Sequence, residues 1–128
     1  MLNLDTHILV ALLAGTLSEE EAALVADEPL AISDIVLWEI AKLVQLGRLE
    51  MDLEDSTYLR CLQRIRVIPI SPQIARLSTE MDFKSDPADE IIAATSVAEG
   101  IPLLTRDRTI RRSKIVPLAR TRPARSGE

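Results

Sequence analysis

Several acidic residues lie within or next to apolar segments of this chain, among them Asp34 and Asp86. Asp5 lies inside the apolar opening segment MLNLDTHILVALL, and Glu39 lies among the apolar residues of IVLWEIAKL. Asp89 and Asp107 occur in DPAD and TRD, on either side of the apolar segment IPLLT. An ionised carboxylate removed from water without a partner costs several kcal/mol. Asp5, in its apolar surroundings, therefore needs a base, backbone donors or a cation.

A cluster of such carboxylates suits Mg²⁺, which takes a few carboxylate oxygens and keeps several waters. A bound divalent ion can activate water and stabilise the charge that develops in phosphodiester cleavage. Each acid also has a simpler explanation. Asp86 and Asp107 can cap the helices that they precede, and Asp89 would interact favourably with a helix dipole. Glu39 can pair with a nearby lysine, but Asp5 and Glu39 together in apolar surroundings favour a functional cluster.

The elements around these acids alternate between strand and helix patterns. Strands are predicted at 1–5, 29–33, 66–71, 101–105 and 114–118, and helices at about 6–14, 35–46, 53–65, 87–99 and 107–113, with two more beginning near Ser18 and Pro72. Such alternation predicts an α/β fold with a mainly parallel sheet of four to five strands and helices on both faces. Parallel strands with right-handed crossovers bring their carboxyl ends to one edge, so the acids that follow the strands should converge there.

Several local signals fix the predicted helix ends. Ser18 and Glu21 have the spacing of a capping box. Ser33 or Asp34 can cap the next helix, which Gly47 closes. In this helix we expect Trp38 to take part in packing, with a role on a partner surface as the alternative.

Bulk properties indicate one folded domain. The chain has 128 residues, of which 47% are hydrophobic, enough for a substantial core. No apolar run approaches the ~18 residues of a membrane span, and no signal peptide is recognised, so we expect a cytoplasmic protein. Cys61 is the single cysteine and His7 the single histidine, which argues against an internal disulfide and a zinc site.

Charge is unevenly distributed along the chain. Residues 106–128 carry eight basic and two acidic residues, a balance of +6, whereas residues 1–105 carry −11, within a net charge of −5. Arg108, Arg111 and Arg112 fall on one helical face beside Asp107. This face is either simply solvated or a patch that attracts the phosphates of RNA.

Three segments taken in order resemble a known family. LDTHILVALL, ISDIVLWEIAKLVQLGRL and DPADEIIAATSVAEGIPLLTRDRTI resemble the PIN-domain ribonucleases, in particular the VapC-type toxins of toxin–antitoxin pairs. The resemblance covers residues 2 to about 118, and DPADEIIAATSVAEGIPLLTRD is its most specific part. It implies a three-layer α/β/α PIN-like nuclease domain over 1–118, followed by a basic, flexible tail over 119–128.

The resemblance also implies an activity and partners. We expect an endoribonuclease that depends on Mg²⁺ or Mn²⁺, with transfer RNA as an expected substrate, a cognate VapB-like antitoxin and a homodimeric state. The antitoxin can insert a basic side chain into the acid cluster. The implied site consists of four catalytic, metal-binding acids and two supporting hydroxyls: Asp5, Glu39, Asp89, Asp107, Thr6 and Thr105.

Three alternatives compete with a toxin nuclease. A receiver-type signalling domain would need a phosphorylatable Asp and a late Lys at strand ends, where the sequence has Ser71 and Leu118. A non-catalytic PIN-fold protein would bind a basic partner through its acidic cleft. A housekeeping RNA-processing nuclease would share the chemistry but have no antitoxin.

Overall fold

The computed structural model describes residues 1–120. Within them, four strands form one parallel sheet in the order β3-β2-β1-β4. The elements in chain order are β1 (Leu2–Leu4), α1 (Thr6–Ala14), α2 (Glu19–Ala26), β2 (Leu30–Ser33), α3 (Ile35–Gln45), α4 (Ser56–Gln63), β3 (Arg66–Ile68), α5 (Pro72–Ser78), α6 (Pro87–Glu99), β4 (Leu103–Leu104) and α7 (Arg108–Arg111).

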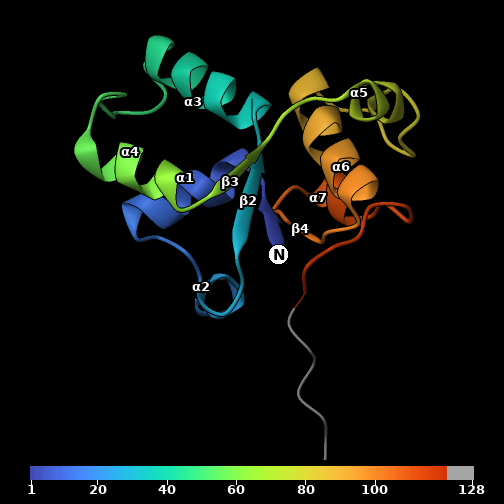
Figure 1. Ribbon diagram of the computed structural model, residues 1–128, viewed down its shortest axis with the longest axis horizontal. Coiled ribbons are helices and arrows are strands. Elements are labelled where there is room, and N and C mark those ends of the chain that lie inside the picture. Colours follow the sequence, from blue (N-terminus) through green and yellow to red (C-terminus); the bar gives the residue numbers. More distant parts are fainter. Residues whose placement is uncertain (121–128) are drawn as a thin grey trace, which may run out of the picture.

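Helices cover both faces of the sheet, which confirms the three-layer α/β/α architecture. Figure 1 shows α1 and α4 on one side of the strands and α5 and α6 on the other. The core lies between these layers and includes Leu4, Ile8, Ile32, Ile92 and Leu103, all fully buried. A smaller apolar cluster beneath α5 and α6 completes the second layer. In the described part of the chain, no helix is both long and apolar enough to cross a membrane.

Local sequence signals explain where the helices begin. Ser18 and Glu21 form the predicted capping box of α2, with reciprocal bonds of 3.1 and 2.9 Å. Ser71 caps α5 by accepting from the Ile74 N–H, with Pro72 in the first turn. At α3 the Ser33 hydroxyl accepts from the Ile35 N–H, whereas the Asp34 side chain makes no capping bond. Among the two expected caps of α3, the serine is therefore the one used.

Two sequence predictions about elements are wrong. The strand expected at 114–118 is reduced to a single bridge between Leu103 and Leu118. The Ser113 hydroxyl accepts from two following amides, Ile115 and Val116, and so folds the segment into a turn. The helix expected over 53–65 begins only at Ser56, because Asp55 caps it by accepting from the Tyr58 N–H.

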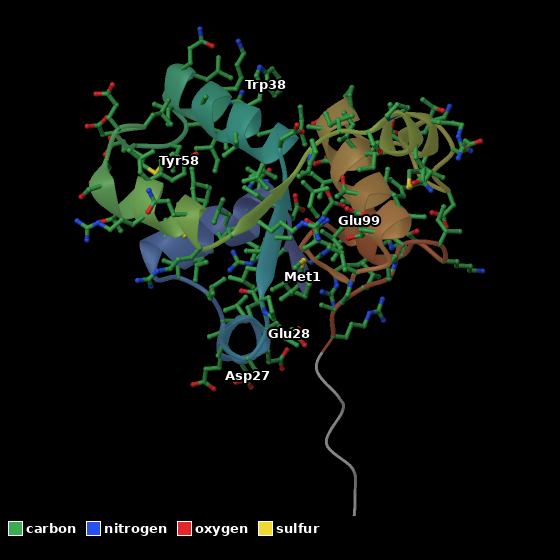
Figure 2. The ribbon with its side chains drawn as sticks, in the orientation of Figure 1. Met1, Asp27, Glu28, Trp38, Tyr58 and Glu99 are labelled. Atoms are coloured by element: carbon green, nitrogen blue, oxygen red, sulfur yellow. The ribbon has the colours of Figure 1, made fainter. Side chains whose placement is uncertain are left out.

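Trp38 does not pack in the core as expected. Its side chain is 56% exposed, and Figure 2 shows it on helix α3. Val36 and Ile40 of the same helix are fully buried. Because side chains four apart share a helix face and a residue midway between them faces away, the burial of this pair turns Trp38 outwards.

Candidate functional site

The site begins at the point where the strand order reverses. The chain runs from β1 to β2 and β3 on one side, and returns to place β4 on the other side of β1. Ligands of parallel α/β sheets bind at this switch, beyond the carboxyl ends of the strands. Asp5 follows β1 and Thr105 follows β4, and the Asp5 N–H donates to the Leu104 carbonyl over 3.0 Å. The register of β1 and β4 therefore places these two side chains next to each other.

Asp5 is the most buried acid of the site, with 2% of its surface exposed. Its Oδ1 accepts from the Thr6 backbone N–H at 2.8 Å, and its Oδ2 accepts from the Thr105 hydroxyl at 2.5 Å. The first of these bonds makes Asp5 the N-cap of α1. Two donors thus hold the carboxylate without a basic side chain bonded to it.

Glu39 reaches the same edge from α3. Its Oε1 accepts from the Thr6 hydroxyl at 2.5 Å, so Thr6 joins Asp5 to Glu39 through its backbone and its side chain. The pairing of Glu39 with Lys42 that the sequence allowed is not formed, because the Lys42 ammonium donates to Gln45 instead.

Asp89 enters from the first turn of α6. The Ser85 hydroxyl donates to its Oδ2 at 2.7 Å. The helix is held against β1 by Asn3, whose fully buried amide donates to the Ile92 carbonyl and the Ser96 hydroxyl at 3.2 and 2.9 Å. Asn3 therefore fixes the helix that carries Asp89 against the strand that precedes Asp5.

Asp107 stands at the start of α7, on the segment that follows Thr105. Its Oδ1 accepts from the Ile110 N–H at 3.0 Å, which makes it the N-cap that the simpler explanation predicted. Its own N–H donates to the Thr105 hydroxyl at 3.0 Å. Thr105 thus bonds to both Asp5 and Asp107, and its hydroxyl sets the spacing of these two acids.

Asp86 behaves differently from the cap predicted for it. It occupies the N-cap position of α6, but its side chain makes no capping hydrogen bond. The carboxylate is exposed, so water satisfies it without a backbone donor. The capping role expected for the Asp86 side chain is therefore wrong.

Burial and the charges of neighbouring acids change the pKa values of the acids in this site. Burial raises the pKa of Asp5, and the charge of Asp107 raises it further, against the opposing bonds from Thr105 and Thr6. Burial also raises the pKa of Glu39, to which Asp89 and Asp5 add. Burial likewise raises the pKa of Asp89, with further contributions from Asp5 and Asp107. All three pKa values are therefore raised first by burial and then by the negative charge of neighbouring acids.

The donor set fits a hard divalent cation. It is rich in carboxylate oxygens, which Mg²⁺ and Mn²⁺ prefer. A cation would offset both the burial of these charges and the repulsion between them, which together raise the three pKa values. Within residues 1–120, no three Asp, Glu, His or Cys side chains lie close enough to ligate one ion as they are placed. Binding therefore requires small side-chain rotations or bridging waters, and Mg²⁺ typically retains such waters.

The basic residues predicted to contact RNA lie on α7. Arg108, Arg111 and Arg112 are all exposed. Arg111 directs one N–H to the Thr105 carbonyl at 3.1 Å. All three arginines are thus open to a ligand, and Arg111 also supports the segment that carries Asp107.

Three residues in or beside the site were not predicted from the sequence. Asn3 and Ser85 bond as described above, and Arg106 pairs with Glu21. The polar residue in the apolar run LNLD was a signal for Asn3. The four-residue spacing of Ser85 and Asp89 was a signal for Ser85. No nearby residue indicated that Arg106 would pair with Glu21.

Comparison with known proteins shows the family of this chain. The model of the PIN domain matches residues 3–115. This chain belongs to the PIN-domain family. A curated relative of this PIN domain, Ribonuclease VapC22 of Mycobacterium tuberculosis, is 34% identical over 89 residues, which cover 67% of this chain and 68% of the relative.

Solved structures confirm the PIN fold. A toxin–antitoxin complex from Klebsiella pneumoniae contains a chain with a TM-score of 0.71 and 26% identity, covering 93% of this chain and 97% of that one. VapBC2 from Rickettsia felis, bound to a DNA fragment from its promoter, gives a TM-score of 0.70 at 21% identity, with 93% and 98% covered. The resemblance inferred from the sequence motifs is therefore confirmed.

Proposed function

We propose that this PIN domain is an endoribonuclease dependent on Mg²⁺ or Mn²⁺, and the toxin of a VapC-type toxin–antitoxin pair. The observation that carries the proposal is the group of three acids with raised pKa values, Asp5, Glu39 and Asp89, at the switch point of the sheet. Similarity to a ribonuclease over two thirds of the chain supports the same activity.

In this proposal the four acids together bind the cation. Asp5, Glu39 and Asp89 hold it directly or through water, and Asp107 completes the set with the oxygen that does not cap α7. When bound, the ion lowers the pKa of a water molecule and offsets the charge that develops on the phosphate. Thr6 and Thr105 keep the carboxylates apart and oriented, as outer partners of metal ligands do.

The proposed RNA contacts are the arginines of α7. Arg108 and Arg112 are exposed on the helix that follows Asp107, and Arg111 lies between them. Such residues attract the backbone of RNA without reading its sequence, so binding should weaken as salt rises. We propose transfer RNA as the substrate on the basis of the family resemblance, with the cut site set by the shape of the RNA.

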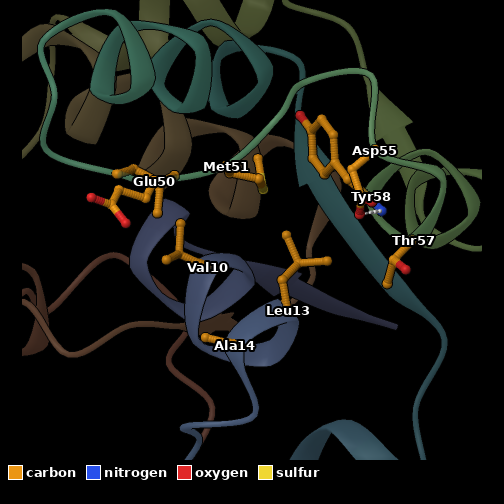
Figure 3. A pocket seen from close by; sticks show the side chains of 9 residues that line it. Val10, Leu13, Ala14, Glu50, Met51, Asp55, Thr57 and Tyr58 are labelled. Atoms are coloured by element: carbon orange, nitrogen blue, oxygen red, sulfur yellow. Dashed lines mark hydrogen bonds between the residues drawn. The ribbon is translucent and has the colours of Figure 1, made fainter.

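A cognate antitoxin is the proposed protein partner. The chain shares its fold and 26% identity with a chain of a toxin–antitoxin complex. Exposed apolar side chains lie on α3 and α4, among them Trp38, Leu46 and Leu59 at 56, 56 and 45% exposure. A pocket of about 180 Å³ between α1 and α4 is lined by residues that include Val10 and Tyr58 (Figure 3). We propose that an apolar antitoxin segment covers this surface, and that the toxin assembles as a homodimer.

Cleavage of RNA in vitro tests the proposed activity. Purified protein is incubated with total small RNA in Mg²⁺, in Mn²⁺ or in EDTA, beside the variants Asp5→Asn and Asp86→Asn. Asp86 is the matched control because it is an exposed acid next to the site that makes no bond there. We expect discrete fragments from the wild type and from Asp86→Asn in either metal, and none in EDTA or from Asp5→Asn. Normal cleavage by Asp5→Asn would show that the assignment of the site is wrong.

The same assay separates the proposed function from its alternatives. A folded protein that binds Mn²⁺ but cuts no RNA would favour the non-catalytic interaction protein. Specific processing of one precursor RNA, without arrest of growth on expression, would favour the housekeeping nuclease.

A further inference from the structure

Arg106 lies between two residues of the acid site but faces away from it. The Thr105 hydroxyl bonds to Asp5 and the Asp107 carboxylate caps α7. The Arg106 side chain is instead 47% exposed and pairs with Glu21 of α2. The pair is bidentate, with Nε to Oε2 at 2.8 Å and Nη2 to Oε1 at 2.7 Å. Nη2 also contacts the Thr16 carbonyl at 3.4 Å. Two of the three guanidinium nitrogens are thus engaged by the protein itself.

The Glu21 carboxylate is held in place by bonds from two residues. Its carboxylate also accepts from the Ser18 N–H at 2.9 Å, as the second half of the capping box of α2. Its side chain is only 15% exposed, and Arg106 holds the pKa of Glu21 down to about 2. The carboxylate therefore stays ionised at any physiological pH, and its position is fixed from two sides.

Apart from this pair, few contacts hold α2 against the rest of the domain. The helix contains no fully buried residue, and only partly buried side chains such as Leu24 and Val25 pack against the core. In Figure 1 it stands apart from the other helices, at the lower edge of the sheet. The Glu21–Arg106 pair is therefore a principal link between this helix and the segment 105–107.

That segment has matching support on its inner side. Arg111 donates to the Thr105 carbonyl at 3.1 Å, and the Ile110 N–H donates to Asp107. The segment 105–107 is thus bonded to α7 through the Thr105 carbonyl and the Asp107 side chain, and to α2 through the Arg106 side chain. A shift of this segment would move both Asp107 and the hydroxyl that bonds to Asp5.

We propose that Glu21 is a positioning residue for the acid site, acting through its bidentate bond to Arg106 to fix the segment 105–107. The inference rests on the proposed function, since the fixed segment carries one proposed cation ligand and the hydroxyl that orients another. Neither Glu21 nor Arg106 touches the cation or the RNA in this role.

The test compares Glu21→Gln with Ser18→Ala. Glutamine is accepted at this position of a capping box, so Glu21→Gln keeps the start of α2 while it removes the charge and one acceptor of the pair. Ser18→Ala does the reverse, because it removes the cap hydroxyl and leaves Glu21 and Arg106 untouched. A structural effect of a weakened α2 would appear in both variants, whereas a positioning effect appears in Glu21→Gln alone.

Two readouts are needed, and the first requires no metal. Hydrogen exchange of the Asp107 amide, which donates to Thr105, should be faster in Glu21→Gln than in Ser18→Ala. The second readout is Mn²⁺ affinity by calorimetry, which should fall about tenfold in Glu21→Gln, as for losses of outer partners of metal ligands. Excess Mn²⁺ should then restore the rate of RNA cleavage.

Each other outcome overturns the proposal. Unchanged exchange at Asp107 means that the pair does not fix the segment. Faster exchange with unchanged Mn²⁺ affinity means that the segment does not control the site. Wild-type protein that binds no Mn²⁺ and cuts no RNA is a failure of the proposed function itself, recognised without any substitution at Glu21, and the positioning role falls with it.

Discussion

Substitution of Thr105 by valine removes one hydroxyl from the centre of the acid site. Valine has nearly the same shape, so the change creates little cavity at a residue that is 2% exposed. Two hydrogen bonds are lost: the one that Thr105 donates to Asp5 at 2.5 Å and the one that it accepts from the Asp107 N–H at 3.0 Å. The substitution thus isolates the bonding of the hydroxyl from its volume.

The expected cost follows from these two bonds. A hydrogen bond to a charged group contributes about 1.5–3 kcal/mol, and a buried donor left without a partner costs about 1–3 kcal/mol. We therefore expect Thr105→Val to lower the free energy of unfolding by about 3 kcal/mol or more. Thr95→Val is the matched control, because Thr95 is fully buried and its hydroxyl bonds only to the Ile91 carbonyl of its own helix. Its loss should cost about 1 kcal/mol.

The same substitution changes cation binding in a direction that the pKa of Asp5 predicts. The bond from Thr105 lowers the pKa of Asp5 against the larger effect of burial, so its loss raises this pKa further. Because a carboxylate must be deprotonated to ligate a metal, Mn²⁺ affinity should fall about 10- to 100-fold. The loss should be greater at pH 6 than at pH 8.

Calorimetric Mn²⁺ titration at pH 6, 7 and 8, together with urea denaturation, measures both effects. Thr95→Val should bind Mn²⁺ like the wild type at each pH. Equal Mn²⁺ affinities of Thr105→Val and Thr95→Val at every pH would refute the reasoning, because the hydroxyl would then have no part in holding Asp5.

Two further predictions concern stability. Since the folded pKa of Glu21 is about 2, below its ordinary 4.5, the Glu21–Arg106 pair stabilises the fold above about pH 4.5 and loses this effect as the pH falls towards 2. Solvent screens the half-exposed Arg106, so Glu21→Gln should cost about 1 kcal/mol at pH 7 and nearly nothing at pH 2, as urea denaturation at both pH values would show; an equal cost at both would contradict the ion pair. Ile8→Ala, at a fully buried site, should lower the free energy of unfolding by about 2–5 kcal/mol. Ile115→Ala, 46% exposed, should change it by less than about 0.5 kcal/mol, and similar losses in the two variants would place Ile8 outside the core.

Features encoded by nearby residues could be predicted from the sequence. The capping box of Ser18 and Glu21 needs only a three-residue spacing, and it forms as predicted. Asp5 is the more instructive case, because the alternation of strands and helices sufficed to predict that it would meet residues a hundred positions away. The rule that parallel strands end at one edge carries that information.

Features that depend on one pairing among many could not be predicted in this way. The sequence contains many acidic residues that could pair with Arg106, and only the fold brings Glu21 next to it. The segment 114–118 has an apolar pattern typical of a strand, but Ser113 diverts its amides into a turn. Trp38 was assigned to packing by its residue type, whereas the burial of Val36 and Ile40 decides which way the helix faces. The last part of the predicted basic tail, 121–128, lies outside the described residues.

We propose above that the acids at the end of β1, in α3, in α6 and before α7 form one cation-binding site. Substoichiometric Mn²⁺ added to isotopically labelled protein tests it most directly, because the ion broadens the amide signals of residues near it. We predict that signals around Asp5, Glu39, Asp89 and Thr105 disappear first, and that Asp5→Asn protects all of them together. Broadening that begins instead at the exposed acids near Asp27 and Glu28, with the signals around Asp5 left sharp, would contradict the account.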